Sequence, residues 1–225
     1  MIRLENVSKA YILGNEKIKA LDDINLNIKD GEFVSIIGPS GSGKSTLMNI
    51  IGLLDNNYRG KYYLDNKEVG KLNDNELSLL RSKSIGFVFQ HFNLLPKLTA
   101  IENVMVPLLY QGYTDKEAYN LSKEALKRVN LSHRINHLPN ELSGGQMQRV
   151  SIARAIVSKP KLILADEPTG AVDTKTGEEI IKIFEELNKN GQTIILITHD
   201  LNIASHAKRT LKIKDGQIIG AETWK

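Results

Sequence analysis

The sequence Gly-Pro-Ser-Gly-Ser-Gly-Lys-Ser at residues 38–45 constrains the fold more than any other stretch of the chain. It matches the pattern G-x-x-x-x-G-K-[ST], a loop whose backbone N–H groups surround nucleotide phosphates. Residues 34–37 before the loop are mostly apolar and predict a buried strand. The apolar residues after the loop have helical spacing and are Leu47, Ile50, Ile51 and Leu54. Because a strand, a glycine-rich loop and a helix follow one another in this order, the stretch predicts nucleotide binding.

The residue types within this loop suit phosphate binding. The glycines let the backbone turn its N–H groups toward one point, and the helix N-terminus adds partial positive charge there. The Lys44 ammonium can reach the β- and γ-phosphates, and the Ser45 hydroxyl can bind Mg²⁺. The alternative is a glycine-rich turn without a ligand, but the four fixed positions occur by chance in only about one chain in a hundred of this length. We therefore expect a nucleotide site formed by Gly38, Pro39, Ser40, Gly41, Ser42, Gly43, Lys44, Ser45 and Thr46.

Composition limits the other classes of protein. The 225 residues can form one core with a smaller subdomain, and 41% hydrophobic and 25% charged residues are typical of soluble globular proteins. Apolar runs are shorter than the roughly 18 residues of a membrane span, and the start lacks the layout of a signal peptide. The absence of cysteine excludes disulfides and suits a cytosolic protein. The net charge of +4 is dispersed rather than gathered in a basic stripe, so we expect no nucleic-acid partner.

Strand patterns mark the two ends of the chain. Apolar and polar residues alternate within residues 1–30, and Gly14 with Asn15 marks the expected turn between two strands. Residues 62–64, Tyr-Tyr-Leu, indicate another short strand. Near the other end, apolar residues face each other across Asp215 and Gly216, which is typical of a β-hairpin.

Helical periodicity dominates from about residue 74 to residue 155, and afterwards strands and helices alternate. Thr176 and Glu179 form the pattern of a capping box at the start of one late helix. The apolar runs 162–165 and 193–198 predict buried strands. The pattern predicts an α/β fold with a mostly parallel sheet, an antiparallel edge region and a helical insert.

We expect this organisation to form a single domain over residues 1–225. Its phosphate-binding core would comprise residues 1–90 and 156–225, which hold the expected strands. The helical subdomain would cover about residues 91–155, where helical periodicity prevails.

A second motif, Leu-Ser-Gly-Gly-Gln at residues 142–146, opens an expected helix over residues 143–157. A serine hydroxyl, two glycines and a helix N-terminus can bind an anion, although a plain N-cap explains the motif equally well when it stands alone. Together with the phosphate loop, this motif makes the chain similar to the ATP-binding subunits of ABC transporters, over essentially its whole length. In that family the motif contacts the γ-phosphate held by the partner subunit. The resemblance thus implies a head-to-tail homodimer in which the partner's ATP is bound by Ser143, Gly144, Gly145 and Gln146.

The apolar residues 162–165 end in two carboxylates, Asp166 and Glu167. A carboxylate at this position can hold Mg²⁺ jointly with Ser45. The resemblance implies that Glu167 is the general base, which polarises the attacking water. A solvated acidic strand end, which is common in α/β proteins, is the alternative.

The resemblance assigns four further residues. Gln90, after Gly-Phe-Val-Phe, matches the loop glutamine that contacts Mg²⁺ and the water, and His199 matches the switch histidine at the γ-phosphate. Asp173 matches the loop that crosses the dimer interface, although Val172 stands where the family often has leucine. Tyr11 matches the aromatic residue that stacks on adenine, but an ordinary strand aromatic explains it nearly as well. The expected catalytic residues are Glu167, His199, Lys44 and Gln90, and the expected metal ligands are Ser45, Gln90 and Asp166.

Residues 91–104 and the run Ala-Asp-Glu-Pro-Thr-Gly at residues 165–170 resemble the MacB/LolD-type subfamily, although Met147 replaces its usual glutamine. Members serve macrolide or peptide export, antimicrobial-peptide resistance and lipoprotein release. The resemblance implies a cytoplasmic ATPase that uses ATP and Mg²⁺ and energises a separate integral-membrane permease at the inner face of the membrane. Apolar residues suited to receive a coupling helix of the permease, or to form subdomain core, are Phe92, Leu94, Leu95 and Leu98.

Three other classes share these motifs. Chromosome-maintenance ATPases carry a long coiled coil within the cassette, and no sustained heptads appear in this sequence. Translation factors of this type carry two cassettes in one chain, whereas this chain has one phosphate loop. A non-catalytic nucleotide-binding regulator is disfavoured because Glu167 and His199 are both present.

Overall fold

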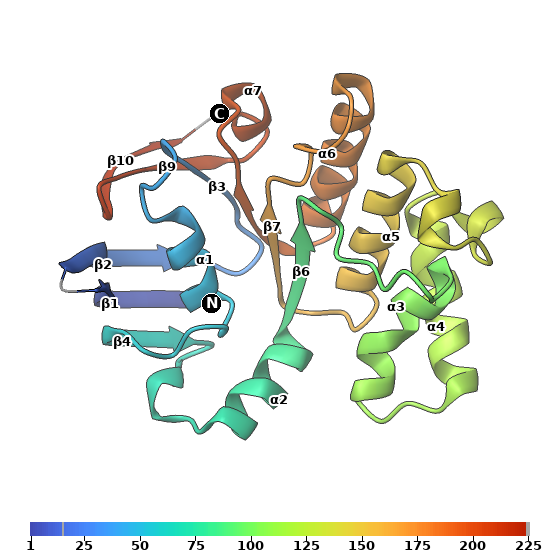
Figure 1. Ribbon diagram of the computed structural model, residues 1–225, viewed down its shortest axis with the longest axis horizontal. Coiled ribbons are helices and arrows are strands. Elements are labelled where there is room, and N and C mark those ends of the chain that lie inside the picture. The colour runs from blue at the N-terminus through green and yellow to red at the C-terminus, as the bar shows by residue number, and fades with distance from the viewer. Residues whose placement is uncertain (15, 224–225) are drawn as a thin grey trace. The chain divides into compact units, whose positions relative to one another are not determined.

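The computed structural model describes residues 1–14 and 16–223, so Asn15 of the expected first turn lies outside the described residues. The chain forms two compact units (Figure 1). Unit 1 comprises residues 1–81 and 191–225, and unit 2 comprises residues 82–190. The predicted helical insert, residues 91–155, falls inside unit 2, and its status as a separate subdomain stays a prediction.

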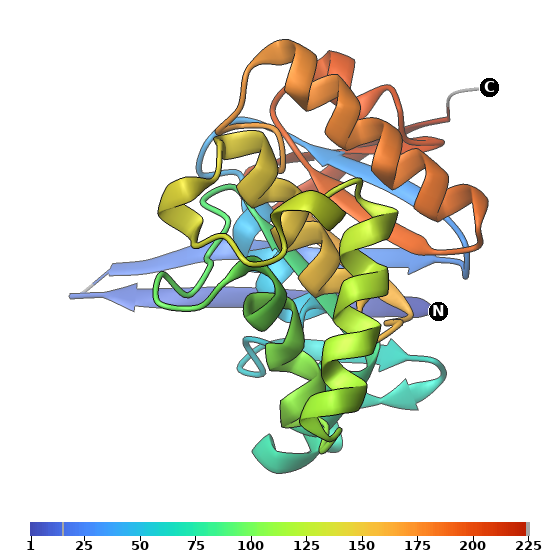
Figure 2. The ribbon, with the colours of Figure 1, turned by 90° about the vertical axis from the view of Figure 1, so that its right-hand side faces the viewer.

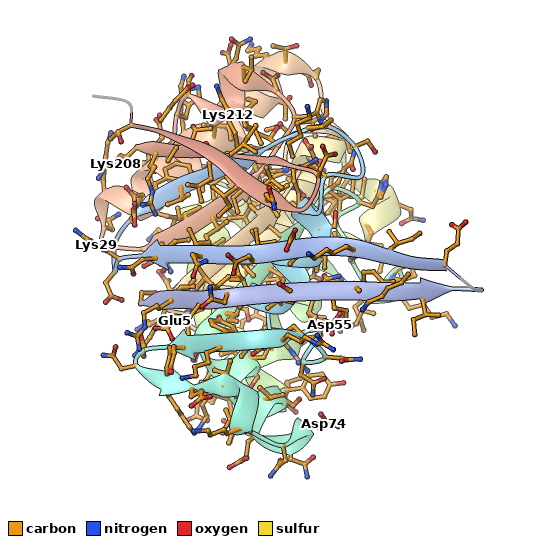
Figure 3. All side chains as sticks on the ribbon, turned by 90° about the vertical axis from the view of Figure 1, so that its left-hand side faces the viewer. Glu5, Lys29, Asp55, Asp74, Lys208 and Lys212 are labelled. Carbon is orange, nitrogen blue, oxygen red and sulfur yellow. The ribbon has the colours of Figure 1, made fainter. Side chains whose placement is uncertain are left out.

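An antiparallel sheet in unit 1 has the strand order β2-β1-β4-β5. Its strands are β1 (Ile2–Leu13), β2 (Glu16–Ile28), β4 (Arg59–Leu64) and β5 (Lys67–Glu68). The alternation seen in the sequence holds here, because Ile24, Leu26 and Ile28 are buried while the residues between them are exposed. Figure 3 shows the long strands β1 and β2 with many polar side chains around them. The predicted antiparallel edge region is therefore present.

Parallel strands form the other sheet region of unit 1. Strand β3 (Phe33–Ile37) pairs in parallel with both β8 (Thr193–Ile197) and β9 (Arg209–Lys214). All five residues of β3 and of β8 are buried, as expected for parallel strands covered on both faces. The hairpin between β9 and β10 (Gln217–Thr223) turns at Asp215 and Gly216, where both φ angles are positive, as predicted for this pair.

The helices of unit 1 include α1 (Lys44–Ile51), α2 (Asp74–Ser84, which runs on into unit 2) and the short α7 (Leu201–Ala204), with the 3₁₀ turn η1 (Val69–Lys71). The sequence predicts that α1 extends to Leu54, and this is wrong. The helix stops at Ile51 because Leu53 has a left-handed φ of 57°, which no continuing helix adopts. Leu54 is consequently about half exposed.

Unit 2 combines a parallel strand pair with helices. The strands are β6 (Ile85–Phe89) and β7 (Leu162–Asp166); the helices are α3 (Ala100–Tyr110), α4 (Asp115–Arg128), α5 (Gly144–Ile156) and α6 (Thr174–Lys189), with the 3₁₀ turns η2 (Ser132–Arg134) and η3 (Pro139–Glu141). Helix α5 packs against α3, α4, α6 and β6 (Figure 2). Helix α5 begins at Gly144, within the serine motif of residues 142–146, so the fold carries that motif at the start of a helix in contact with α3, α4, α6 and β6.

Capping residues define where these helices begin. Thr114 caps α4 with Glu117 in a full capping box. The capping box predicted for α6 at Thr176 is wrong, because the N-cap of α6 is Asp173, three residues before Thr176. One Asp173 oxygen accepts the Thr176 N–H at 3.0 Å and the other accepts the Thr176 hydroxyl at 2.6 Å. Aspartate wins this position because its carboxylate satisfies two donors at once and ranks above threonine as a cap.

Candidate nucleotide-binding and hydrolysis site

The phosphate loop of unit 1 ends in a helix that has no side-chain cap. Helix α1 begins at Lys44 after Gly43, whose φ of 103° only glycine adopts easily, and it has no acidic residue in its first turn. By contrast, a side chain of the N-cap residue accepts a backbone N–H in each of α3, α4, α5, α6 and α7. The first N–H groups of α1 are therefore left for another acceptor, and an anion is the acceptor that the helix dipole favours.

Close packing holds the loop in shape. A Cβ atom added to Gly38 would lie 2.1 Å from the carbonyl oxygen of Ile213, and one added to Gly43 would lie 2.5 Å from that of Ala20. In addition, the Gly216 N–H donates to the Ser42 carbonyl at 3.0 Å. Because backbone atoms of β2 and of the β9–β10 hairpin lie this close to the loop, only glycine fits at positions 38 and 43.

The polar side chains of the loop fit a phosphate ligand. The Lys44 ammonium donates to the carbonyl oxygens of Gly38 and Pro39, each at 2.8 Å, so the cation lies over the loop. The Ser42 hydroxyl is buried and has no hydrogen-bond partner among the described residues. Ser45 is exposed. A buried orphan oxygen, a positioned cation and uncapped N–H groups together suit a polyphosphate.

His199 lies at the same edge of the sheet as the phosphate loop. Strands β3 and β8 run in parallel with Ile36 opposite Ile197, and the Thr198 N–H donates to the Ile36 carbonyl at 3.2 Å. The phosphate loop follows β3 and His199 follows β8, so unit 1 brings the two segments together at the carboxyl ends of neighbouring strands. The His199 residue is exposed there.

Tyr11 is supported by an ion pair in unit 1. Its ring is 39% exposed, and its hydroxyl lies 3.4 Å from an Asp55 carboxylate oxygen. The buried Lys9 ammonium contacts both Asp55 oxygens at 2.8 and 2.7 Å and lies 5.0 Å from the centre of the Tyr11 ring. Asp55, labelled in Figure 3, follows the end of α1. These contacts orient the exposed Tyr11 ring, which suits stacking on a base. The alternative, in which Tyr11 is an ordinary aromatic residue of a strand, stays open.

We expect Lys9→Met to lower the free energy of unfolding by about 2–3 kcal/mol at pH 7, because it leaves the Asp55 carboxylate without its cation. Burial raises the pKa of Asp55, but the Lys9 ammonium and the Asn57 N–H outweigh it and hold this pKa below its ordinary 3.8. A carboxyl whose pKa is lower in the folded state stabilises the fold at pH values above its unfolded-state pKa. This contribution to stability is lost as the pH falls through the folded-state pKa. The gap between wild type and variant should therefore shrink in acid below about pH 4.

Urea unfolding at pH 7 and at several values below 4 measures this gap. Lys19→Met is the matched control, because Lys19 pairs with Asp22 on the exposed surface, where solvent screens the pair and its contribution to stability is small. Equal destabilisation by the two variants would contradict the assigned role of Lys9.

In unit 2, three predicted site residues come together at the ends of two strands. Strands β6 and β7 are parallel with Phe89 opposite Asp166, so Gln90 and Glu167 follow at the same edge. A Cβ atom added to Gly170 would lie 2.8 Å from the Gln90 side-chain nitrogen. The Gln90 side chain therefore lies against the loop that begins with Glu167, and a glycine at position 170 makes room for it.

Glu167 has a strained backbone. Its φ is 45°, in the left-handed region that residues other than glycine seldom adopt. The carbonyl of Glu167 accepts the Gly170 N–H at 2.9 Å, which closes a tight turn after β7. Strain of this kind gathers at functional sites, where the surrounding structure maintains it. No sequence signal foretold it, because glutamate is not a residue typical of such turns.

The serine motif forms a complete capping box at the start of α5. The Ser143 hydroxyl accepts the Gln146 N–H at 3.3 Å, and the Gln146 side-chain oxygen accepts the Ser143 N–H at 3.0 Å. A Cβ atom added to Gly145 would lie 2.3 Å from the Thr176 methyl group. The second glycine thus lets α5 approach α6, which is a packing role that the sequence did not reveal. The exposed Ser143 still has a hydroxyl proton to offer a ligand.

Asp173 is exposed at the end of the loop that follows β7. The Thr176 hydroxyl and then its N–H hold the pKa of the Asp173 carboxyl below its usual range. Asp173 therefore caps α6 as an anion, and its predicted role at a dimer interface stays a prediction.

Comparison with known proteins decides the family. The family described as "ABC transporter" matches residues 21–170. The chain belongs to the ABC transporter family. It is 53% identical over 223 residues to the ABC transporter ATP-binding protein YknY of Bacillus subtilis, covering 99% of this chain and 97% of YknY. It is also 49% identical over 216 residues to the macrolide export ATP-binding/permease protein MacB of Bartonella henselae, covering 96% of this chain and 33% of MacB.

Solved structures of ABC cassettes have the same fold. The dimeric structure of MJ0796, a protein of Methanocaldococcus jannaschii, has a TM-score of 0.93 and 50% sequence identity, covering 100% of this chain and 99% of that one. A second MJ0796 structure, a dimeric post-hydrolysis state bound to ADP and Pi, also has a TM-score of 0.93 at 49% identity. The predicted resemblance to the ABC family and the predicted α/β fold are confirmed. Within the described residues, no helix of this ABC protein has the length and apolarity to span a bilayer.

The residues that the sequence predicts as metal ligands have the chemistry that Mg²⁺ prefers. Among the described residues there is no cluster of three His, Cys, Asp or Glu side chains that could hold a metal ion. Mg²⁺ needs no such cluster, because it is usually held by one or two carboxylates together with substrate phosphates. The Ser45 hydroxyl, the Asp166 carboxylate and the Gln90 amide oxygen are hard ligands of this type.

Two residues of helix α5 in this ABC protein have roles that no sequence pattern indicates. Gln148 is fully buried and Arg154 is half-buried, and both donate hydrogen bonds to loops that follow β6 or β7. In the sequence they look like ordinary residues of an amphipathic helix. Burial of a polar or charged side chain becomes visible only when the helix is packed.

Proposed function

We propose that this chain binds and hydrolyses ATP to energise a separate membrane permease, which exports or extracts a peptide, antibiotic or lipoprotein-like substrate. The chain is an ATPase of the ABC class. The observation that carries the proposal is the phosphate loop, where uncapped helix α1, the Lys44 cation and the orphan Ser42 hydroxyl converge. MacB, whose name joins an ATP-binding part to a permease, supports the transport role.

The residues divide the chemistry between them. In this proposal Lys44 and the N–H groups of α1 stabilise charge on the phosphates. Glu167 accepts a proton from water as the water attacks the γ-phosphate in line and the bond from the γ-phosphate to ADP breaks, while His199 and Gln90 orient that water. Mg²⁺, held by Ser45, Gln90 and Asp166, would neutralise charge on the phosphate oxygens when it is bound.

Two copies of the chain would act as a head-to-tail dimer. Residues 143–146 of one copy would contact the γ-phosphate bound by the other, and Asp173 would lie at the boundary. The dimeric structures of MJ0796 support this arrangement. ATP binding would close the dimer, and hydrolysis with phosphate release would open it again, so that the permease is driven through a cycle.

A groove in unit 2 is suited to the permease. It has a volume of about 580 Å³, and its apolar lining consists of Leu98, Ile101, Met105, Val106, Leu109 and Tyr119. Glu102 and Asp115 add negative charge to it. An amphipathic helix with basic flanks fits such a groove, as in other helix-in-groove complexes. Of the four apolar residues expected to contact a coupling helix, Leu98 lines the groove. Through this contact the protein would lie at the inner face of the membrane.

We expect Met105→Glu to weaken association with the permease at least tenfold, because it places a charge inside the apolar groove. The basal ATPase rate of the purified chain should remain unchanged. Ile219→Glu is the control, since Ile219 is an exposed residue of β10 in unit 1.

The measurement is co-purification from membranes with identification of the bound integral protein, followed by ATPase assays with that protein. Stimulation by this protein, lost in Met105→Glu and kept in Ile219→Glu, supports the proposal. Stimulation by DNA or ribosomes, with no membrane protein recovered, would refute the transport role in favour of the other cassette classes.

A further inference from the structure

Arg154 on α5 forms two hydrogen bonds to the Gln90 loop, residues 90–99, which joins β6 to α3. Its guanidinium donates to the carbonyl oxygen of Asn93 at 2.6 Å and to that of Phe92 at 2.8 Å. Phe92 and Asn93 both have left-handed backbones, with φ of 59° and 49°. A planar guanidinium with two parallel donors is suited to a pair of neighbouring acceptors, which a lysine ammonium cannot match. Burial lowers the pKa of Arg154, so the cation is partly removed from water to make these bonds.

A second residue of α5 binds the same region from the other side of Gln90. The Gln148 side-chain nitrogen donates to the Pro168 carbonyl at 2.7 Å and lies 3.4 Å from the Phe89 carbonyl. Gln90 therefore stands between two points, Phe89 and Phe92, at which α5 contacts the chain. Pro168 belongs to the turn that starts at Glu167, so α5 also contacts the loop of the proposed general base.

The remainder of the Gln90 loop has little freedom of its own. The side-chain oxygen of the buried Asn103 accepts the Leu95 N–H at 2.7 Å, and its side-chain nitrogen lies within hydrogen-bond distance of the carbonyl oxygens of Leu95, Leu98 and Thr99. These bonds fix the far end of the loop to α3, and α3 packs against α5. A displacement of the Gln90 backbone that is passed along the loop to Phe92 and Asn93 would therefore act on Arg154 of α5.

We propose that Arg154 is a positioning residue that couples Gln90 to the serine motif at the start of α5. The inference rests on the proposed function, in which Gln90 responds to the nucleotide of its own subunit and residues 143–146 act on the nucleotide of the partner. Because α5 is a single rigid helix, a change at Gln90 that passes through Arg154 alters the partner's site. Arg154 then makes the two ATP sites of a dimer cooperative.

Two substitutions test the pair of hydrogen bonds donated by the Arg154 guanidinium, and a substitution of another arginine on α5 serves as the control. Arg154→Met keeps the aliphatic stem and removes the donors, while Arg154→Lys keeps the charge without the pair of donors. Arg149→Met is the matched control on the same helix, because Arg149 pairs with Glu179 at 2.7 Å and donates to the Val129 carbonyl instead of the Gln90 loop.

The readouts are the Hill coefficient and kcat of ATP hydrolysis and the affinity of each chain for a fluorescent ATP analogue. In Arg154→Met we expect the Hill coefficient to fall from about 2 to about 1 and kcat to fall about tenfold. Affinity for the analogue should change less than about twofold, since Arg154 is not among the residues expected to contact the nucleotide. Arg154→Lys should be intermediate, and Arg149→Met should remain cooperative.

A cooperative Arg154→Met enzyme, or a non-cooperative wild type, overturns the inference. A wild type without any hydrolysis would instead refute the proposed function, so the two failures are distinguishable. If Arg154→Met does not fold, hydrogen exchange of the wild type decides. Peptides covering residues 90–99 and 143–150 should gain protection at the same Mg²⁺-ATP concentration, and responses at clearly different concentrations would contradict coupling through Arg154.

Discussion

Replacing Glu167 with glutamine should leave ATP binding intact and lower the hydrolysis rate by about 10²- to 10⁴-fold, which is the usual contribution of a general base. Glutamine has nearly the same shape as glutamate but cannot accept a proton from water. The substitution should be tolerated structurally, because the turn at position 167 is maintained by the backbone bond from Gly170. Phosphate release measures turnover, and titration calorimetry measures ATP affinity.

Glu178→Gln is the control for this change, since Glu178 is an exposed residue of α6. It should hydrolyse ATP at the wild-type rate. Undiminished hydrolysis by the purified Glu167→Gln protein would remove Glu167 from the role of base. The same variant also tests assembly. With Mg²⁺-ATP it should accumulate as a dimer in light scattering, because the closed state is no longer resolved by hydrolysis. A strictly monomeric variant, both alone and with the permease, would contradict the head-to-tail dimer.

Replacing Lys44 with alanine should weaken ATP binding about 100-fold or more, equivalent to the loss of roughly two charge-assisted hydrogen bonds. In the structure the ammonium is bonded to the carbonyls of Gly38 and Pro39 at the mouth of the loop. Phosphate oxygens would be better acceptors for it, because they carry full negative charge. The backbone of the loop should survive the change, since Gly38 and Gly43 are held by packing against their neighbours.

Calorimetric titration with ATP measures the loss of affinity in Lys44→Ala. Lys71→Ala provides the control, because Lys71 is an exposed lysine of unit 1 paired with Glu68. It removes the same charge from the chain and should bind ATP with wild-type affinity. Equal ATP affinity of Lys44→Ala and wild type would show that the loop does not use this ammonium to hold phosphates.

Local sequence patterns were reliable where the structure is local. The phosphate loop, the Asp215–Gly216 hairpin and the serine cap of α5 depend on residues close in the chain, and each forms as expected. The predicted start of α6 and the predicted end of α1 were wrong, because the local sequence allows more than one structure there. Thr176 has the pattern of a cap, yet the carboxylate of Asp173 captures both its N–H and its hydroxyl. Leu54 has helical spacing, yet the backbone at Leu53 turns away before it.

The order of residues along the chain was sufficient to identify an ATPase of the ABC family. The residues that bind phosphate and cap helices are close together in the sequence, so their types and spacing indicate the site directly. Folding decided the rest. The sequence contains no sign that Arg154 meets Phe92, 62 positions away, that Lys9 meets Asp55, 46 positions away, or that Glu167 adopts a left-handed turn. Such contacts depend on which buried groups find partners once the chain is packed, and no local spacing encodes that.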